Sequence, residues 1–219
     1  MSTTIKIETR DDSVKSEVMR QIDHTKLTIA AATVAAELFH AEVIAKQLTI
    51  SAKNAAAIVL RAGSQAAGLS VISSYYDELA SKTITLARSI NITAVQLSMV
   101  SVTEWRTSAV VTQVERARDM MDNAEAVGTV AKLGIKVEAE LEHLSEGFQR
   151  LLKELYEQLD EVQRNMRAID VIAVTSRLEA QQTGEFKEGL MQMANSIQDQ
   201  ASEIKNHVAK SVSLLNTYT

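Results

Sequence analysis

Two Glu-x-x-His motifs are the residues of this chain best suited to do chemistry. Glu37 with His40 and Glu140 with His143 each place a carboxylate and an imidazole three positions apart. On a helix this spacing puts both groups on one face, and two such motifs with two further carboxylates hold the di-iron centre of some four-helix bundles. The motifs raise the hypothesis of a ferritin-like di-iron enzyme.

Little else in the sequence suggests catalysis. No nucleophile elbow, glycine-rich phosphate loop or metalloprotease helix motif occurs, and the chain has no cysteine. The formal net charge is -5, and acidic and basic residues are interspersed rather than gathered into the basic face that nucleic acid requires. We therefore predict no enzyme activity, no cofactor, no metal and no nucleic-acid partner.

The elements that must position these residues are predicted to be long helices. The 219 residues include no proline and seven glycines, and 46% are hydrophobic but only 4% aromatic. The usual helix breakers are thus rare, and the apolar content is mostly Ala, Val, Ile and Leu. This composition predicts an all-α fold, an elongated antiparallel four-helix bundle or coiled coil made of two long helical hairpins.

Apolar periodicity supports this fold along most of the chain. The third predicted helix repeats in steps of four and three, typical of a coiled coil, with Gln158 and Asn165 as polar members. The predicted apolar stripes are Val14, Val18, Ile22, Ile29, Phe39 and Val43; Val137, Leu141, Leu144, Phe148, Leu151, Leu155, Val162 and Ile169; and Ile197, Ala201, Ile204, Val208, Val212 and Leu215.

Segment boundaries follow from these stripes and from the glycines. Residues 101–134, which include Trp105, fit the periodicity least, and Gly128 and Gly134 offer helix stops there. The predicted segments are a disordered 1–11, then a single bundle over 12–219 made of hairpin 12–122 with its tip near 47–54 and hairpin 123–219 with its tip near 168–176.

Two glycine pairs mark an internal repeat. Gly63 with Gly68 and Gly184 with Gly189 share one spacing, and the second pair follows the first by 121 residues. Each pair lies just after an alanine-rich apolar run, and glycine is the strongest turn signal in a chain without proline. We expect two equivalent turns at the same end of the bundle.

The first repeat carries a family resemblance. The segment 47–65 reads Gln-Leu-Thr-Ile-Ser-Ala-Lys-Asn-Ala-Ala-Ala-Ile-Val-Leu-Arg-Ala-Gly-Ser-Gln. It resembles the hairpin tip of the cytoplasmic signalling domain of methyl-accepting chemotaxis proteins. The matching residues are Gln47, Ala52, Asn54, Ala55, Ala56, Arg61, Ala62, Gly63 and Gly68, with Leu69 in the place of a phenylalanine. The second repeat keeps Ala173, Glu179, Ala180, Gly184, Glu185 and Gly189.

The resemblance implies a role in signalling through protein contacts. It implies docking of the chemotaxis histidine kinase and its coupling protein at the tips, and a single chain with two hairpins could imitate the receptor dimer. The implied docking residues are Gln47, Ile50, Asn54 and Arg61 in the first copy and Asp170, Glu179 and Glu185 in the second, with Gly63, Gly68, Gly184 and Gly189 serving turns and packing. Self-association into dimers or larger bundles, and a purely structural coiled coil without kinase contact, remain alternatives.

The repeat register argues against the di-iron hypothesis. His40 lies seven residues before Gln47, whereas His143 lies 25 residues before the equivalent Ala168. The difference of 18 residues corresponds to about 27 Å of helix, and the metals of such a pair are about 4 Å apart. The two motifs cannot then share one centre.

The sequence predicts no membrane insertion and a cytoplasmic location. The longest uninterrupted apolar run, with two threonines counted in it, is the ten residues 27–36, and a bilayer requires roughly 20. The first twelve residues do not resemble a signal peptide.

Overall fold

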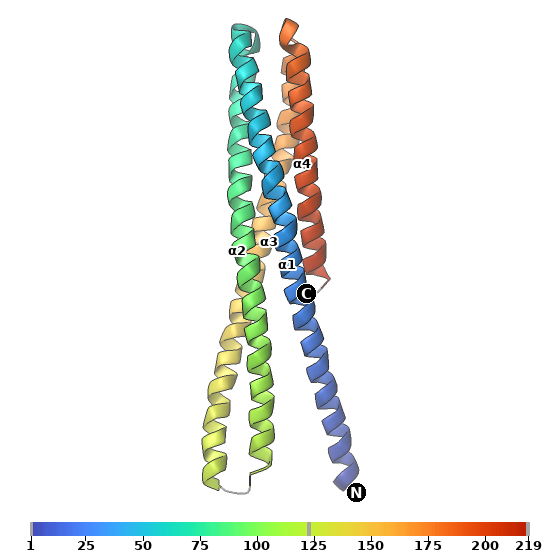
Figure 1. The fold of residues 1–219 in the computed structure, drawn as a ribbon, viewed down its shortest axis with the longest axis vertical. Helices are drawn as coiled ribbons and strands as arrows, with labels where there is room; N and C mark the ends of the chain where they lie inside the picture. Colours follow the sequence, from blue (N-terminus) through green and yellow to red (C-terminus); the bar gives the residue numbers. More distant parts are fainter. Residues whose placement is uncertain (1, 122–123, 218–219) are drawn as a thin grey trace. The chain divides into compact units, whose positions relative to one another are not determined.

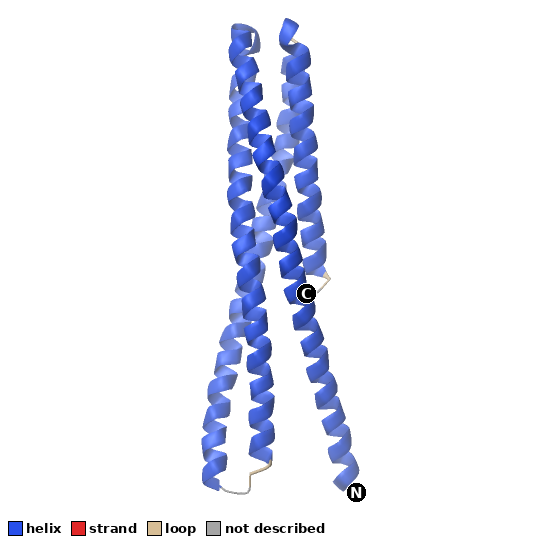
Figure 2. Cartoon of the chain, viewed as in Figure 1, coloured by secondary structure: helices blue, strands red, loops and turns tan. Residues whose placement is uncertain are grey.

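The computed structural model describes residues 2–121 and 124–217, with side-chain environments for 26, 28–121 and 126–217. The α-helices are α1 (Ser2–Ala62), α2 (Ala67–Asp119), α3 (Ala124–Ala180) and α4 (Lys187–Asn216), and the 3-10 helices are η1 (Gly63–Ala66) and η2 (Gly184–Phe186) (Figure 1). The described residues contain no strand (Figure 2). The predicted all-α helical bundle is confirmed.

Contacts divide the chain into two compact units. One unit, here called the paired-turn unit, consists of Thr33–Thr93 and Glu154–Thr217, and the second consists of the rest of the chain. The sequence predicted one bundle for residues 12–219. The paired-turn unit contains both glycine pairs and all of the helix-helix contacts described below, so it positions the candidate site.

Neighbouring helices of the paired-turn unit run antiparallel. Along α2 and α3, Tyr76 bonds to Ser176 and Ser89 bonds to Gln158, so residue numbers rise on one helix as they fall on the other. The same order holds between α3 and α4 and, because Ser51 contacts Gln200 while Glu37 contacts His207, between α1 and α4. The chain reverses between α1 and α2 at η1. The further contacts are Arg88 with Glu42, Lys205 with Asp170, Tyr156 with Asn216, and Glu37 with His207.

Buried residues of α1 recur in steps of three and four, which is the spacing of a coiled-coil seam. The core seam of α1 is Val34, Leu38, Ala41, Ala45, Leu48, Ala52, Ala55, Val59 and Ala62. The residues 121 positions later are also buried. Related buried pairs include Val34 and Leu155, Leu38 and Leu159, Leu48 and Ile169, Ala52 and Ala173, Leu69 and Leu190, and Ala80 and Ala201. The internal repeat is therefore present in the core as well as in the glycines.

The predicted stripe of α1 was wrong. Ile29, Phe39 and Val43 are exposed, whereas Leu38 and Leu48 are buried. The core seam of α1 is largely alanine, so its hydrophobic signal is weaker than that of the larger residues on the outer face. Val14, Val18 and Ile22 lie outside the residues whose side chains are described.

The predicted seam of α3 was half right. Val137, Phe148, Leu155, Val162 and Ile169 are buried as predicted. The alternate members are displaced by one residue: the buried side chains are Leu152, Leu159 and Met166, and the half-buried ones are Leu151, Gln158 and Asn165. In α4 the predicted stripe is buried except at Val212, where Ser211 is buried instead.

The chain reverses later than predicted. Residues 47–54 lie inside α1 and residues 168–176 inside α3, because neither segment holds a residue that breaks a helix. The reversals are at η1 and η2, which begin at Gly63 with φ +59° and Gly184 with φ +58°. Glycine adopts positive φ without steric cost, which explains why the helices end there.

Three further boundaries differ from the prediction. Residues 2–11 belong to α1 rather than to a disordered segment, since nothing from residue 2 to 62 is Gly or Pro. Gly128 and Gly134 lie within α3 and do not stop it. The reversal lies between Asp119 and Ala124, close to the predicted 122, and residues 122–123 are outside the described part of the chain. Residues 101–119 continue α2, with Trp105 half-buried.

Candidate functional site

The two turns of the paired-turn unit share one small core. Val59, Ala62, Ala66 and Leu69 from the first copy pack with Ala180 and Leu190 from the second. Partly buried Ile58, Ile72, Phe186 and Met191 lie against this cluster. The expectation that both turns lie at the same end of the bundle is confirmed (Figure 1).

Contacts near the turns follow an approximate twofold relation. A Cβ on Gly68 would meet the carboxylate of Glu179, and a Cβ on Gly189 would meet Cδ1 of Ile58 at 3.7 Å. Residue 189 follows 68 by 121 positions, and residue 179 follows 58 by the same number. Gly68 thus faces Glu179, and Gly189 faces Ile58, which is the repeat equivalent of Glu179.

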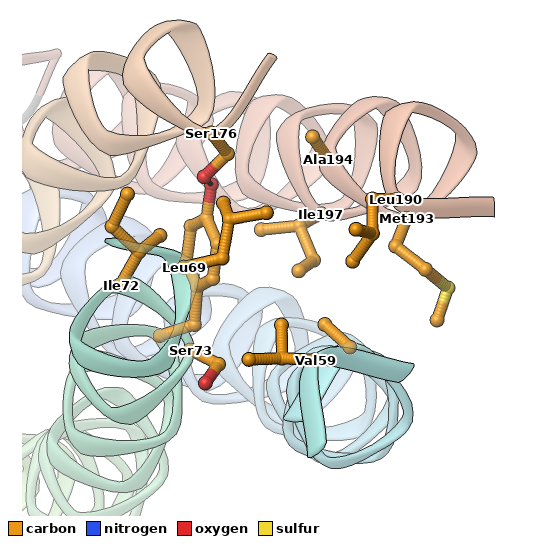
Figure 3. A pocket seen from close by; sticks show the side chains of 11 residues that line it. Val59, Leu69, Ile72, Ser73, Ser176, Leu190, Met193, Ala194 and Ile197 are labelled. Atoms are coloured by element: carbon orange, nitrogen blue, oxygen red, sulfur yellow. Dashed lines mark hydrogen bonds between the residues drawn. The ribbon is translucent and has the colours of Figure 1, made fainter. Parts of the chain in front are cut away.

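A small cavity lies beneath the turns, between the two copies. Its volume is about 20 Å³, which suits one water molecule, and mostly apolar side chains line it (Figure 3). Tyr76 and Ser176 form a 2.7 Å hydrogen bond at its wall. Burial raises the pKa of Tyr76 to about 12 despite the opposing effects of that bond and of Arg177. The cavity is too small for an organic substrate, so we treat it as part of the core.

The predicted docking residues of the first copy are all exposed. Gln47, Asn54 and Arg61 recur every seven residues, so they form one row along α1. Ile50 lies in the neighbouring row. The row spans 14 residues, about 21 Å, and ends at the turn, where Arg61 Nε donates a 3.4 Å hydrogen bond to the carbonyl of Ala57.

The predicted docking residues of the second copy are less uniform. Glu185 is exposed in η2. Glu179 is half-buried against Gly68, and Asp170 is half-buried and accepts a 2.5 Å hydrogen bond from Lys205 Nζ. Asp170 is therefore half of an ion pair between α3 and α4. The structure does not bring the seven predicted docking residues into one cluster.

A polar groove between α1 and α4 was missed by the sequence analysis. It has a volume of about 720 Å³, and Gln47 is its α1 contribution. Its α4 wall is acidic, with Glu188, Asp199 and Glu203. These acids could be found on α4 by helical spacing, but their proximity to Gln47 depends on α4 lying beside α1. The other lining residues are Met191, Gln192, Asn195, Ser196 and Gln200.

The first Glu-x-x-His motif forms a contact with α4. Oε2 of Glu37 lies 2.7 Å from Nδ1 of His207, and Lys210 Nζ donates to Oε1. The imidazole of His40 stacks on His207 with ring centroids 5.6 Å apart. The hydrogen bond from Lys210 is the main cause that lowers the pKa of Glu37, and burial opposes it.

These contacts do not form a metal centre. Among the described residues, no group of three or more His, Cys, Asp and Glu side chains could hold a metal ion. Glu140 and His143 are exposed on α3 in the second unit. Glu37 instead neutralises Lys210, and this role of the motif was not predicted because His207 and Lys210 are 170 and more residues away in sequence.

Among the residues that the structure describes, one helical segment passes a test for membrane spans. Thr28–Asp119 includes an 18-residue window that is long and apolar enough to cross a bilayer, judged by length and composition alone. Core helices of other proteins, which are mostly buried, pass the same test. In this chain 28% of the window is buried. Polar residues interrupt this segment, so it contains no uninterrupted apolar run longer than the ten residues 27–36.

Comparison with protein-family models, curated proteins and solved structures finds no match for this chain.

Proposed function

We propose that this protein is a signalling or scaffold protein that binds partner proteins at the end of the paired-turn unit where its two turns meet. The observation that carries the proposal is the shared core of η1 and η2, which fixes two repeated turns against one another. A rigid end of this kind can present side chains in a constant arrangement, which lowers the entropic cost of binding.

The exposed chemistry of this end suits protein contacts. Arg61 and Glu185 are exposed beside the two turns, and Asn54 is exposed one heptad before Arg61. Arginine is enriched at protein interfaces because its planar guanidinium donates several hydrogen bonds at once. The charged and amide side chains at this end therefore include both hydrogen-bond donors and hydrogen-bond acceptors.

The resemblance to the chemoreceptor tip supplies the partners to test. It suggests the chemotaxis histidine kinase and its coupling protein, with Gln47, Asn54 and Arg61 as contacts in the first copy. The second candidate is a purely structural bundle, which the continuous core seam of both copies supports equally well.

The experiment is a pull-down of the purified full chain with the kinase and the coupling protein. Arg61→Ala and Asn54→Ala should lower binding at least tenfold. Arg164→Ala is the matched control, because Arg164 is an exposed arginine of α3 that pairs with Asp160, 16 residues before the end of that helix. It should leave binding unchanged.

The outcomes separate the two candidates. Binding that is lost in Arg61→Ala and kept in Arg164→Ala supports docking at the turns. An absence of binding by the unmodified chain would overturn the chemotaxis role and leave the structural bundle. Equal loss in both arginine variants would show that charge in general, rather than the turn end, carries the contact.

A further inference from the structure

The outward face of α1 carries a second heptad seam. Its residues alternate in steps of three and four, as the core seam does, and all eight are exposed. Phe39 is 56% exposed, Ile50 60% and Leu60 83%. The outer seam consists of Ala36, Phe39, Val43, Lys46, Ile50, Lys53, Ala57 and Leu60.

The internal repeat provides a control for this observation. The eight positions that follow the outer seam by 121 residues, seven in α3 and one directly after it, are also exposed. Five of them are charged or amide residues, whereas the outer seam of α1 has six apolar members and two lysines. The related residues are Glu157, Asp160, Arg164, Arg167, Val171, Val174 and Leu178 of α3, and Gln181 directly after it. Since α1 and α3 have the same place in the core, the fold itself does not require apolar residues outside α1.

We propose that the outer seam of α1 packs antiparallel against the outer seam of a second copy of this chain. A seam with steps of three and four is what a coiled-coil partner with the same steps fits. A twofold axis near residue 48 makes such a contact isologous, because each seam then meets itself in reverse. This proposal is independent of the proposed docking at the turns.

The residue sizes of the outer seam complement one another in this alignment. Ala36 meets Leu60 of the partner subunit, and Phe39 meets Ala57 of the partner subunit, so that each large residue meets a small one. In the centre, Val43 meets Lys53 of the partner subunit and Lys46 meets Ile50 of the partner subunit. A lysine can cover an aliphatic side chain with its methylene stem while its ammonium remains in water.

A parallel alignment lacks this complementarity. It would place Lys46 opposite the partner subunit's Lys46 and Lys53 opposite the partner subunit's Lys53, which is repulsive. It would also oppose two phenylalanines at position 39 and two alanines at position 36. The antiparallel alignment places no lysine directly opposite another lysine and pairs each large residue at the ends of the seam with a small one.

The size of the seam predicts the strength of the contact. Residues 36–60 extend about 36 Å along α1, and a helix is about 10 Å wide, which gives a footprint of about 360 Å² for each copy. Because stable interfaces bury about 800 Å² per partner, the dimer should dissociate on dilution.

The experiment is sedimentation equilibrium of the full chain over a wide concentration range. The mass should rise from 24.0 kDa toward twice that value as the concentration increases. Ile50→Glu should keep the chain monomeric at all concentrations. Val171→Glu is the matched control, because Val171 is the repeat equivalent of Ile50 and is 69% exposed, and it should dimerise like the unmodified chain.

Disulfide cross-linking tests the orientation, since the chain has no cysteine of its own. The double variant Ala36→Cys with Leu60→Cys should cross-link into dimers under oxidising conditions, and circular dichroism checks that it folds. The single variants should not, because an antiparallel pair keeps like positions about 36 Å apart. Cross-linking by the single variants would overturn the antiparallel arrangement.

Two other results would overturn the proposal. One is a chain that stays monomeric at the highest concentration. If such a monomer instead co-sediments with vesicles of phosphatidylcholine and phosphatidylglycerol, the outer seam binds a lipid surface rather than a second copy. The other is a dimer that Ile50→Glu and Val171→Glu weaken equally. Circular dichroism of both variants shows whether each remains helical, so that loss of dimer is not confused with loss of fold.

Discussion

A Cβ on Gly68 of α2 would stand 2.7 Å from Oε2 of Glu179 on α3. At the equivalent pair, a Cβ on Gly189 would stand 3.7 Å from Cδ1 of Ile58. The two copies therefore keep the same close helix approach, while the residue facing the glycine has changed from an apolar to an acidic one. The end of a glutamate side chain can move aside, so the approach at Gly68 does not make a larger residue impossible there.

Alanine at two glycines should change stability in opposite directions. Gly63 has φ +59°, which alanine adopts at a cost of about 1–2 kcal/mol, so Gly63→Ala should lower the free energy of unfolding. Gly189 lies within α4 and has room for a methyl group, so Gly189→Ala should raise it by about 0.5–1 kcal/mol. Urea unfolding followed by circular dichroism measures both. A change of the same sign in both variants would contradict the assignment of Gly63 as the turn residue.

Removing the partner of Tyr76 should cost more than removing its hydroxyl. Ser176 Oγ donates a 2.8 Å hydrogen bond to the carbonyl of Ile172, so the Tyr76 hydroxyl donates to Ser176. Ser176→Ala leaves a buried hydroxyl without its acceptor and should cost about 1–3 kcal/mol. Tyr76→Phe should cost about 0.5–1.5 kcal/mol, because Ser176 keeps its bond to the backbone. Alanine suits this position, since the repeat equivalent of Ser176 is Ala55. Urea midpoints of the two variants in the reverse order would exclude this direction of the bond.

The same tyrosine should make stability depend on alkaline pH. The pKa of Tyr76 is about 12 in the folded chain against 10.0 in the unfolded one, so its neutral form is favoured by folding. The resulting stabilisation is present below pH 10.0 and is lost as the pH rises through about 12. Tyr76→Phe should reduce the fall in the urea midpoint over this range. Ultraviolet titration of the folded chain should show a tyrosine ionising near pH 12 that is absent in Tyr76→Phe.

The presence of two equivalent turns at one end could be predicted from the sequence, but the residues at which the chain reverses and the outer and core faces of α1 could not. Gly63 and Gly184 were recognisable because only glycine accepts their positive φ readily. The core seam of α1 is built of small residues such as Ala45, and the outer seam carries larger ones such as Phe39. A prediction based on the size of apolar residues assigns the outer face of α1 to the core, because the sequence does not record which face meets other helices.

The environment of Glu37 was beyond the sequence for a different reason. The motif with His40 was visible, but its partners His207 and Lys210 come from α4, which is distant in the chain. Which helices become neighbours depends on how two hairpins dock, and local periodicity carries no information about it. For the same reason the acidic α4 wall beside Gln47 could not be predicted.

Glu37→Gln should lower stability at neutral pH and flatten its dependence on acid. The pKa of Glu37 is lowered from 4.5, so its stabilisation is present above pH 4.5 and is lost as the pH falls through the folded value. We expect a loss of about 1–2 kcal/mol, at the low end for charged hydrogen bonds because Lys210 is 63% exposed. The urea midpoint of the variant should differ less between neutral pH and a pH below 4.5 than the midpoint of the unmodified chain does.

A surface carboxylate provides the control for this variant. Glu78 pairs with Lys82, and both side chains are more than half exposed, so Glu78→Gln should change stability by less than about 0.5 kcal/mol. Glutamine is compatible with the site of Glu37, since its repeat equivalent is Gln158, which donates to Ser89. Equal effects of the two variants would contradict a stabilising role for the contact with His207 and Lys210.

Two leucines of α3 should respond differently to the same truncation. Leu159 is fully buried in the core seam, and Leu178 is 65% exposed near the turn. Leu159→Ala should cost about 2–5 kcal/mol because it removes buried methyl groups and leaves a cavity. Leu178→Ala should change stability by less than about 0.5 kcal/mol, since the side chain is largely in water already. The measurement is thermal and urea unfolding of each variant. A small effect at Leu159 would show that the seam of α3 lies one residue earlier, through Leu151, Gln158 and Asn165, as the sequence alone predicted.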